Sequence, residues 1–344
     1  AAYSKASEIN PQYRYNLVNS ANLQSLKGEF KQAIPLYRQF LEEYPNNAEA
    51  RKNLASAYML TEQPDKAAKE FEYILKNNPA EFKEYASYGK VLVQTKEFKK
   101  AVPVLESAIK DNPQNAEIYA DYGVALLNNG EKQKAADAFM KSLDLNPSLT
   151  EVKLALANVL VDLKKEDAAI KYYNEYLTKV PENPDALYNL GIIYQGRNKV
   201  DESIKNLEKA NKLKPEDAGI KKELGRSYHL AKNYTKALEQ YEAALSAKKN
   251  DPELYYNLGL VHFAFKNYDK SQEYLEKSLA LKDDAKVKAD YKNTLLAKAN
   301  SLNVVGKHEE AIATYQSVLK INPTEFYALS GMANALQKMG RHDE

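Results

Sequence analysis

The sequence predicts an all-α protein, an α-solenoid of antiparallel helix pairs with a repeat of 34 residues. The first observation is a proline that recurs every 34 residues, at Pro11, Pro45, Pro79, Pro113, Pro147, Pro181 and Pro215. The second is a pair of small residues at fixed places in each interval. The third is helical apolar spacing, as in Tyr119, Tyr122, Gly123 and Leu126. A fixed period of this length indicates a repeat array in which each unit buries its apolar face against its neighbours.

Each repeat is expected to contain two helices that approach closely. The first helix carries a small residue at Ala21, Ala55, Gly89, Gly123, Ala157, Gly191, Gly225, Gly259, Ala299 and Ala333. The second helix carries one at Ala33, Ala67, Ala101, Ala135, Ala169, Ser203, Ala237, Ser271 and Ala311, and then a large residue at Tyr37, Phe71, Leu105, Phe139, Tyr173, Leu207, Tyr241, Leu275 and Tyr315. A Gly, Asn or Lys, such as Gly28 or Gly130, is expected in the turn between the helices. The proline ends the second helix.

The pattern resembles the tetratricopeptide repeat (TPR) family over essentially the whole chain. The residues that carry the resemblance are Tyr188, Leu190-Gly191 and Tyr194; Leu224-Gly225, Tyr228, Ala237, Tyr241 and Ala244; and Tyr255 with Leu258-Gly259. The resemblance implies a right-handed superhelix whose inner wall is built mainly from the first helices, at positions 2, 5, 6, 9 and 12 of each repeat. Arrays of this kind use an extended concave surface for binding.

In this register, residues 1–13 form the second half of a preceding repeat, and residues 14–325 form nine complete units. The units begin at Arg14, Ala48, Phe82, Ala116, Thr150, Pro184, Ala218, Pro252 and Lys292, and residues 326–344 hold the first helix of a further, truncated repeat. The unit at Pro252 has six extra residues, 286–291, which we expect to form an inter-helix extension that protrudes from the array, as a structural accommodation or as a partner contact. Because neither end looks capped, we expect a fragment of a longer array or protein.

Composition excludes several classes of function. The chain has 344 residues, with 49 Lys and Arg against 47 Asp and Glu, and this balance argues against a binder of nucleic acid or of anionic membranes. The only arginines are Arg14, Arg38, Arg51, Arg197, Arg226 and Arg341. With no cysteine, disulfides and thiolate chemistry are excluded. No apolar run is long enough for direct membrane insertion. We expect a soluble protein, cytoplasmic or periplasmic.

No catalytic or metal-binding constellation stands out. The four histidines are His229, His262, His308 and His342, and none pairs with another at helical spacing to suggest a metal site. His229 and His262 could lie near each other on the inner wall, but we interpret both as packing residues. There is no phosphate loop and no nucleophile elbow. The sequence therefore predicts no enzyme, no cofactor and no metal.

The wall positions that the resemblance implies give candidate partner-binding residues. They are apolar, then basic, then apolar and aromatic in chain order: Val124, Leu127, Leu154, Asn158, Val161, Tyr188, Asn189, Ile192, Lys222, Arg226, His229, Tyr256, Asn257, Leu260 and Phe263, with Gln195 beside them. An exposed apolar patch marks a contact surface. There are two alternatives: these residues pack partly against the adjoining unit, or a self-association interface covers them. Asparagines at positions 6 and 9 could hydrogen-bond the backbone of an extended ligand: Asn19, Asn53, Asn189 and Asn257, and Asn22, Asn158 and Asn300.

The hypothesis is a protein–protein interaction scaffold that binds a peptide or helix of a partner in the concave groove, with an acidic group facing Lys222 and Arg226. The carboxylate clamp that the family uses for chaperone tails is incomplete: the positions that follow Lys52 are Ser56, Ser87, Glu117 and Asp121. One alternative is the targeting or assembly arm of a larger enzyme, or of a secretion, polysaccharide-export or other envelope machine. Another is a self-association module, a homo-oligomer formed through open array ends.

Overall fold

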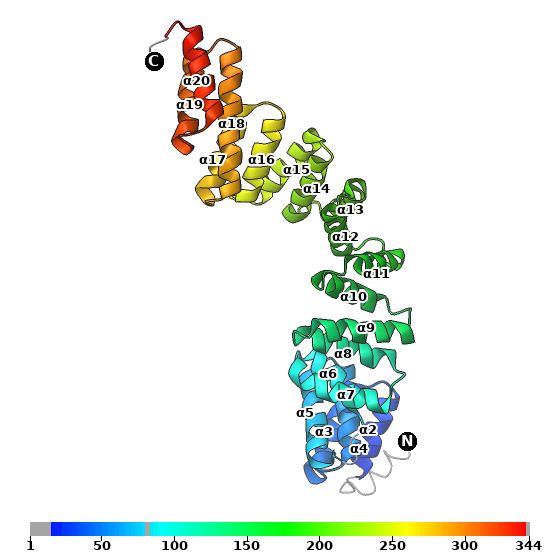
Figure 1. Cartoon of the computed structure of the whole chain (residues 1–344). Helices are drawn as coiled ribbons and strands as arrows, with labels where there is room; N and C mark the ends of the chain where they lie inside the picture. Colours follow the sequence, from blue (N-terminus) through cyan, green and yellow to red (C-terminus); the bar gives the residue numbers. More distant parts are fainter. Residues whose placement is uncertain (1–14, 80–82, 342–344) are drawn as a thin grey trace. The chain divides into compact units, whose positions relative to one another are not determined.

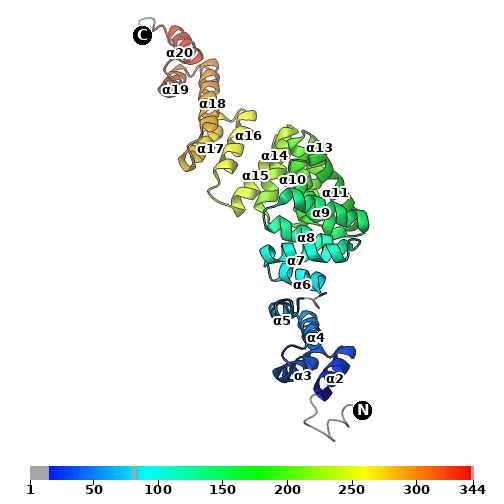
Figure 2. The same cartoon turned by 60° about the horizontal axis from the view of Figure 1, so that its bottom comes forward.

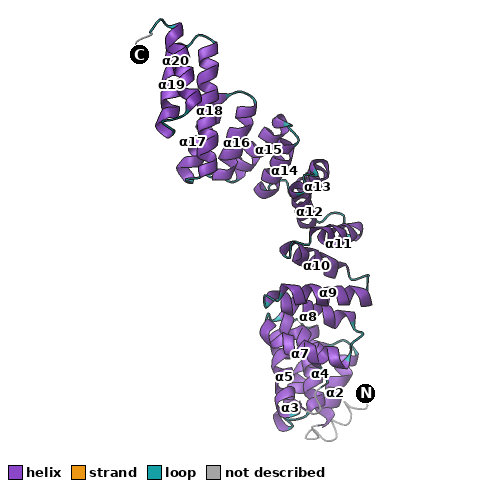
Figure 3. Ribbon diagram, in the orientation of Figure 1, coloured by secondary structure: helices purple, strands orange, loops and turns teal. Residues whose placement is uncertain are grey.

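The computed structural model describes residues 15–79 and 83–341, and throughout these ranges the chain forms helices and short turns without a strand (Figure 3). The chain divides into two compact units, Ala1–Lys179 and Val180–Glu344. In both units each helix packs against the one that follows it, so that first and second helices alternate along the stack (Figure 1). The fold is therefore a solenoid of helix pairs.

Within its described residues the first unit contains five helix pairs, which Figure 2 shows from a second direction. They are α2 (Tyr15–Leu26) with α3 (Phe30–Glu43), α4 (Ala48–Leu60) with α5 (Pro64–Asn77), α6 (Tyr85–Gln94) with α7 (Phe98–Asp111), α8 (Ala116–Asn128) with α9 (Lys132–Leu145), and α10 (Thr150–Asp162) with α11 (Glu166–Lys179). The sequence places unit starts at Ala48, Ala116 and Thr150, where α4, α8 and α10 begin.

The second unit continues the same alternation. Its helices are α12 (Pro184–Gly196) with α13 (Val200–Leu213), α14 (Ala218–Leu230) with α15 (Tyr234–Ala247), α16 (Pro252–Ala264) with α17 (Tyr268–Leu281), α18 (Ala285–Val304) with α19 (His308–Ile321), and α20 (Phe326–Lys338). Some of the expected features lie outside the described residues. They are the half-repeat at residues 1–13, the unit starts Arg14 and Phe82, and the last three residues of the chain.

Most first helices start at an Asn or Asp that caps the backbone. Asn47 and Asn183 accept a hydrogen bond from the N–H groups of Ala50 and Ala186, and Asp251 accepts from two N–H groups of α16. A cap of this kind satisfies amides that the helix itself leaves without a partner. The repeat boundary is thus fixed locally, by a proline that cannot continue the second helix and a polar residue that starts the next one.

The turn inside each pair requires one residue in the left-handed region. Glycine takes that place at Gly28, Gly130, Gly306 and Gly340, and other residues take it elsewhere, with φ between 57° and 61°: Glu62, Lys96, Lys164, Asn198, Lys232 and Lys266. The expected Gly, Asn or Lys is therefore found at most of these turns, and Glu62 is the exception. The following N–H bonds back to the first helix, as from Glu97 to the Leu92 carbonyl, which is the usual end of a helix with a left-handed residue.

Close approach of the two helices is the central packing feature. The small residues at Ala21, Ala33, Ala157 and Ala169 are completely buried. At Gly191 an added Cβ would lie 2.7 Å from Cγ of Leu207 on the second helix. The large residue of the second helix thus fills the space that the missing side chain leaves.

The six extra residues, 286–291, form the N-terminal part of α18, which is 20 residues long. Val287 is buried, and the Tyr256 hydroxyl on α16 donates to a carboxylate oxygen of Asp290 at 2.8 Å. Lys288 and Ala289 remain exposed. The expectation of an extension that protrudes from the array is wrong, because one face of this helical extension packs against α16.

We predict opposite outcomes for two glycines of α12. Gly191→Leu should lower the free energy of unfolding by several kcal/mol, because even its Cβ overlaps Leu207 and overpacking alone costs ~1–3 kcal/mol. Gly196→Ala should leave it unchanged or raise it by up to about 1 kcal/mol, since no atom lies within 4 Å of the added Cβ and alanine favours the helix. Chemical denaturation of both variants is the test, and an unchanged midpoint for Gly191→Leu would contradict the close-approach argument.

Candidate partner-binding surface

Apart from Gln195, the predicted wall residues keep part of their surface accessible to solvent. None of the candidates from Val124 to Phe263 is buried, and Asn158, Arg226 and Phe263 are exposed. The residues between them on the same helices, such as Leu126 and Leu190, are buried in the core. The first helices therefore present these side chains on the face that is not used for packing.

In the first unit the apolar candidates lie on α8 and α10, which both pack against α9. Val124, Leu127, Leu154 and Val161 are all half-buried. Asp121 stands on α8 beside them, and burial raises the pKa of its carboxyl to about 6, with Lys90 acting in the opposite direction. Sequence reasoning did not select Asp121, although position 6 is one of the wall positions. Its carboxylate makes this apolar stretch sensitive to pH.

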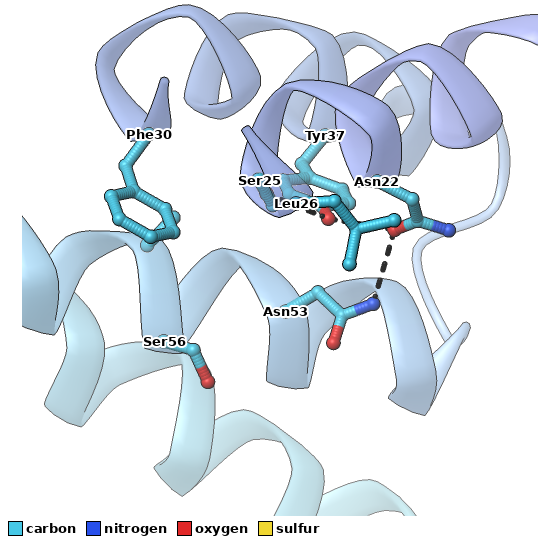
Figure 4. Close-up of a pocket in the computed structure, with 8 residues that line it drawn as sticks. Asn22, Ser25, Leu26, Phe30, Tyr37, Asn53 and Ser56 are labelled. Atoms are coloured by element: carbon cyan, nitrogen blue, oxygen red, sulfur yellow. Dashed lines mark hydrogen bonds between the residues drawn. The ribbon is translucent and has the colours of Figure 1, made fainter. Parts of the chain in front are cut away.

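A hollow of about 300 Å³ lies between α2 and α4, at wall positions of the first two described repeats. Figure 4 shows Asn22, Ser25 and Asn53 around it, with Phe30 at its side. Asn53 donates its Nδ2 hydrogen to Oδ1 of Asn22 at 3.2 Å. These asparagines are among the predicted amides, but the sequence did not distinguish this part of the wall as a hollow.

The asparagines at position 9 also have a structural role. The tyrosine at position 24 of the same repeat donates its hydroxyl hydrogen to the asparagine Oδ1, over 2.5–2.7 Å, in the pairs Tyr37–Asn22, Tyr173–Asn158 and Tyr315–Asn300. A buried phenol needs an acceptor, and the wall amide supplies it. The acceptor oxygen of Asn158 is therefore engaged with the core, and any ligand shares it with Tyr173.

The repeat at Ala218 breaks this pattern. Arg226 occupies position 9, and the fully buried Tyr241 hydroxyl has no hydrogen-bond partner in the part of the chain that the structure describes. An arginine offers donors but no acceptor, so it cannot replace the asparagine. The hydroxyl of Tyr241 is therefore desolvated, which costs free energy, and it lacks the hydrogen bond to asparagine that the other three tyrosines make.

The predicted basic part of the wall is compensated by carboxylates. Lys222 pairs with Glu253 of α16 at 2.5 Å, and Arg226 lies 3.8 Å from Glu223. Burial acts to lower the pKa of the Lys222 ammonium, but Glu253 outweighs it and raises that pKa. Burial raises the pKa of the Glu223 carboxyl. The expected basic stretch thus holds carboxylates of its own, because the next first helix brings Glu253 to Lys222, a partner that sequence spacing along one helix does not show. An acidic ligand group facing Lys222 and Arg226 stays a prediction.

Hydrogen bonds and an ion pair link successive first helices of the second unit. Gln195 of α12 is buried and donates to the Ser227 hydroxyl and the Glu223 carbonyl of α14, so its predicted place on the accessible wall is wrong. Lys222 reaches from α14 to α16, Tyr256 from α16 to α18, and Asn303 from α18 to Asn334 of α20. These bonds fix the register of the wall.

The two wall histidines are packing residues, as interpreted from the sequence. His262 is buried with its ring stacked on Tyr274 at 5.4 Å, and His229 meets Tyr234 edge-on at 5.4 Å. Burial lowers the pKa of both imidazoles. Their separate aromatic partners give them no common site.

The described residues contain neither a membrane-spanning helix nor a cluster of metal ligands. Within residues 15–79 and 83–341, no helix combines the length and apolar character that crossing a bilayer requires. Among the same residues, no three His, Cys, Asp or Glu side chains gather in a way that could hold a metal ion.

The stacked hairpins define a helical-repeat protein, and sequence comparison gives its family. Models described as "Tetratricopeptide repeat" match residues 26–87, 89–149, 150–193, 184–217 and 250–324, and one described as "TPR repeat" matches residues 225–264. The chain belongs to the tetratricopeptide repeat family. No curated protein sequence matches it.

Several solved structures are similar to the chain. The C-terminal part of a TPR repeat-containing protein from Cytophaga hutchinsonii is 18% identical, with 72% of this chain and 98% of that chain covered and a TM-score of 0.50. YrrB, described as a TPR protein with an unusual peptide-binding site, is 22% identical over 53% of this chain and 94% of that chain, with a TM-score of 0.49. A MamA structure from Desulfovibrio magneticus RS-1 is 22% identical, with 48% of this chain and 94% of that chain covered and a TM-score of 0.45.

At these identities the Cytophaga structure shows the shared fold alone. TPR arrays are generally non-catalytic scaffolds whose stacked repeats offer an extended surface to other proteins. The chain has the architecture of such a protein-interaction scaffold.

The tyrosine pairs generate a prediction on stability. Tyr315→Phe should lower the free energy of unfolding by about 1 kcal/mol, because it removes the bond to Asn300. Tyr241→Phe should leave it unchanged or raise it, because the hydroxyl it removes is buried and has no hydrogen-bond partner within the described residues. Equilibrium denaturation compares the two, and equal losses for both variants would refute the assigned roles.

Asp121 generates a prediction on pH dependence. Its pKa is raised from 3.8 to about 6 in the folded chain, so ionisation above that pH destabilises the native state, and the penalty fades as pH falls from 6 towards 3.8. Asp121→Asn should therefore stabilise the chain at pH 7.5, on the order of 2 kcal/mol. The gain should disappear near pH 4. Thermal melting between these pH values is the measurement, with the exposed Asp144→Asn as the control, and a gain independent of pH would contradict the shift.

Proposed function

We propose that the chain binds an extended or helical segment of a partner protein along the inner wall formed by its first helices. The observation that carries this proposal is that the predicted wall residues stay accessible while the positions between them are buried. An accessible apolar strip on a protein usually marks a contact surface. The peptide-binding site that the description of YrrB names is compatible with such a role.

The wall offers both kinds of contact that a peptide needs. Leu127 and Leu154 supply apolar surface for anchor side chains in the first unit, and Ile192 and Leu260 do so in the second unit. Near α2 and α4, Nδ2 of Asn22 and Oδ1 of Asn53 make no hydrogen bond within the described residues, so a donor and an acceptor lie close together. A peptide backbone presents the complementary pair of groups.

The charges of the wall support a segment without a required net charge. Since Glu253 neutralises Lys222, and Glu223 lies close to Arg226, an acidic partner group would have to displace an existing carboxylate. Exchange of one ion pair for another brings little free energy. Affinity therefore comes from apolar burial and from hydrogen bonds to the wall amides.

The test is an affinity pull-down from source lysate with crosslinking and mass spectrometry. We expect Leu127→Glu/Leu154→Glu to lose partners that the wild type retains, because it places two charges in the apolar strip. Ile170→Glu is the matched control, since Ile170 is an equally half-buried apolar residue on the second helix α11. Circular dichroism confirms that each variant is folded. If folded wall and control variants retain the same partners, the wall is not the binding surface.

A further inference from the structure

The second unit carries an apolar surface that the inner wall does not explain. It lies where first helices turn into second helices, in the repeats that begin at Ala218, Pro252 and Lys292. Its exposed residues, here called the turn-edge patch, are Leu230, Phe263, Phe265, Val304 and Val305, with exposed fractions of 46%, 37%, 44%, 82% and 67%. Among them only Phe263 belongs to the predicted wall.

Aromatic contacts join the two phenylalanines of the patch to neighbouring tyrosines. Phe265 meets Tyr234 of the preceding repeat, with ring centroids 6.1 Å apart, and Phe263 meets Tyr268 of its own repeat at 5.6 Å. Beyond them lies an open trough of about 520 Å³ between the turn at Phe265 and the next repeat. Its apolar lining is Phe265, Tyr268 and Leu302. Single apolar residues on a surface need no explanation, but a joined set with a trough does.

Lysines surround this apolar lining. Lys266, Lys298 and Lys307 line the trough, together with the acids Asp269 and Glu310. Both acids are already paired, Asp269 with Lys298 at 2.7 Å and Glu310 with Lys307 at 3.0 Å.

Two positive charges are not compensated. Lys266 in the trough lining and Lys232 at the preceding turn have no ion pair among the residues that the structure describes. The trough thus combines three apolar side chains with one lysine, Lys266, that has no ion pair, unlike the inner wall with its paired charges.

We propose that the turn-edge patch docks an acidic protein segment that carries a bulky apolar side chain. The apolar side chain occupies the trough on Phe265 and Tyr268, and the acidic groups beside it pair with Lys266 and its neighbours. Complementary charge steers such an encounter and selects against basic segments. A concave trough suits a side chain better than a flat bilayer, and the net charge of +2 gives little general attraction to anionic lipids.

This proposal is independent of inner-wall binding, and its test uses a phage-displayed library of random dodecapeptides selected on the full chain. We expect enriched clones to place Asp or Glu around Phe, Trp or Leu. Synthetic versions should bind with a dissociation constant about tenfold higher for Lys266→Glu at low salt. In 0.5 M salt the affinity of the wild type should fall towards that of the variant, because salt screens the ion pairs of the wild type. Val305→Asp and Phe265→Ser provide two independent apolar variants.

The control is Lys164→Glu, which changes a lysine with the same left-handed conformation at the equivalent turn of the first unit. It should leave the affinity unchanged, as should the inner-wall variant Leu127→Glu/Leu154→Glu. Enriched clones without acidic bias, or clones insensitive to all three turn-edge variants, would overturn the proposal. Sedimentation with vesicles of phosphatidylcholine and phosphatidylglycerol is run in parallel, and lipid binding lost in Lys266→Glu, without peptide binding, would assign the patch to a bilayer instead.

Discussion

The rest of the structure depends on how closely the two helices of each pair approach. At Gly123 and Gly225 an added Cβ would lie 2.5 Å and 2.8 Å from the aromatic rings of Phe139 and Tyr241 on the second helix. In two repeats a serine hydroxyl from the second helix donates to the glycine carbonyl of the first, as from Ser203 to Gly191 at 2.8 Å. Each pair is thereby a rigid unit, and its first helix has one face left for the wall.

The same contact couples the composition of the wall to the core. Where the large core residue is Tyr37, Tyr173 or Tyr315, the wall carries asparagine at position 9, because the buried phenol needs an acceptor. Where the core residue is a hydrocarbon, the wall is free of that need and can be aliphatic, as in the pairs Phe139 with Val124, Leu207 with Ile192, and Leu275 with Leu260. Whether position 9 of the wall carries an amide or an apolar side chain therefore depends on which large residue the second helix places in the core.

The sequence contains the local rules of the fold, and these could be predicted. The prolines and the small residues act within one repeat, so their spacing predicts the helix pairs. Pairings between repeats could not be predicted in the same way. The burial of Gln195 and the pairing of Lys222 with Glu253 depend on how one first helix is rotated against the next, which a periodic pattern does not specify. For residues 286–291 the pattern signalled only an insertion. No Pro or Gly interrupts the stretch from Ala285 to Val304, so the insertion lengthens a helix, and Val287 gives it a packed face.

The two proposed surfaces differ in the origin of their affinity. On the inner wall of the second unit, charges are compensated inside the protein, so the binding of a segment there rests on apolar burial and is little affected by salt. At the turn edge, Lys232 and Lys266 have no ion pair among the described residues, so an ion pair between either lysine and a ligand is a net gain that salt screens. A single partner that engaged both surfaces would gain avidity from the tether between its two segments. Ionic strength would then weaken the ion pairs at the turn edge, whereas the apolar contacts on both surfaces would persist at high salt.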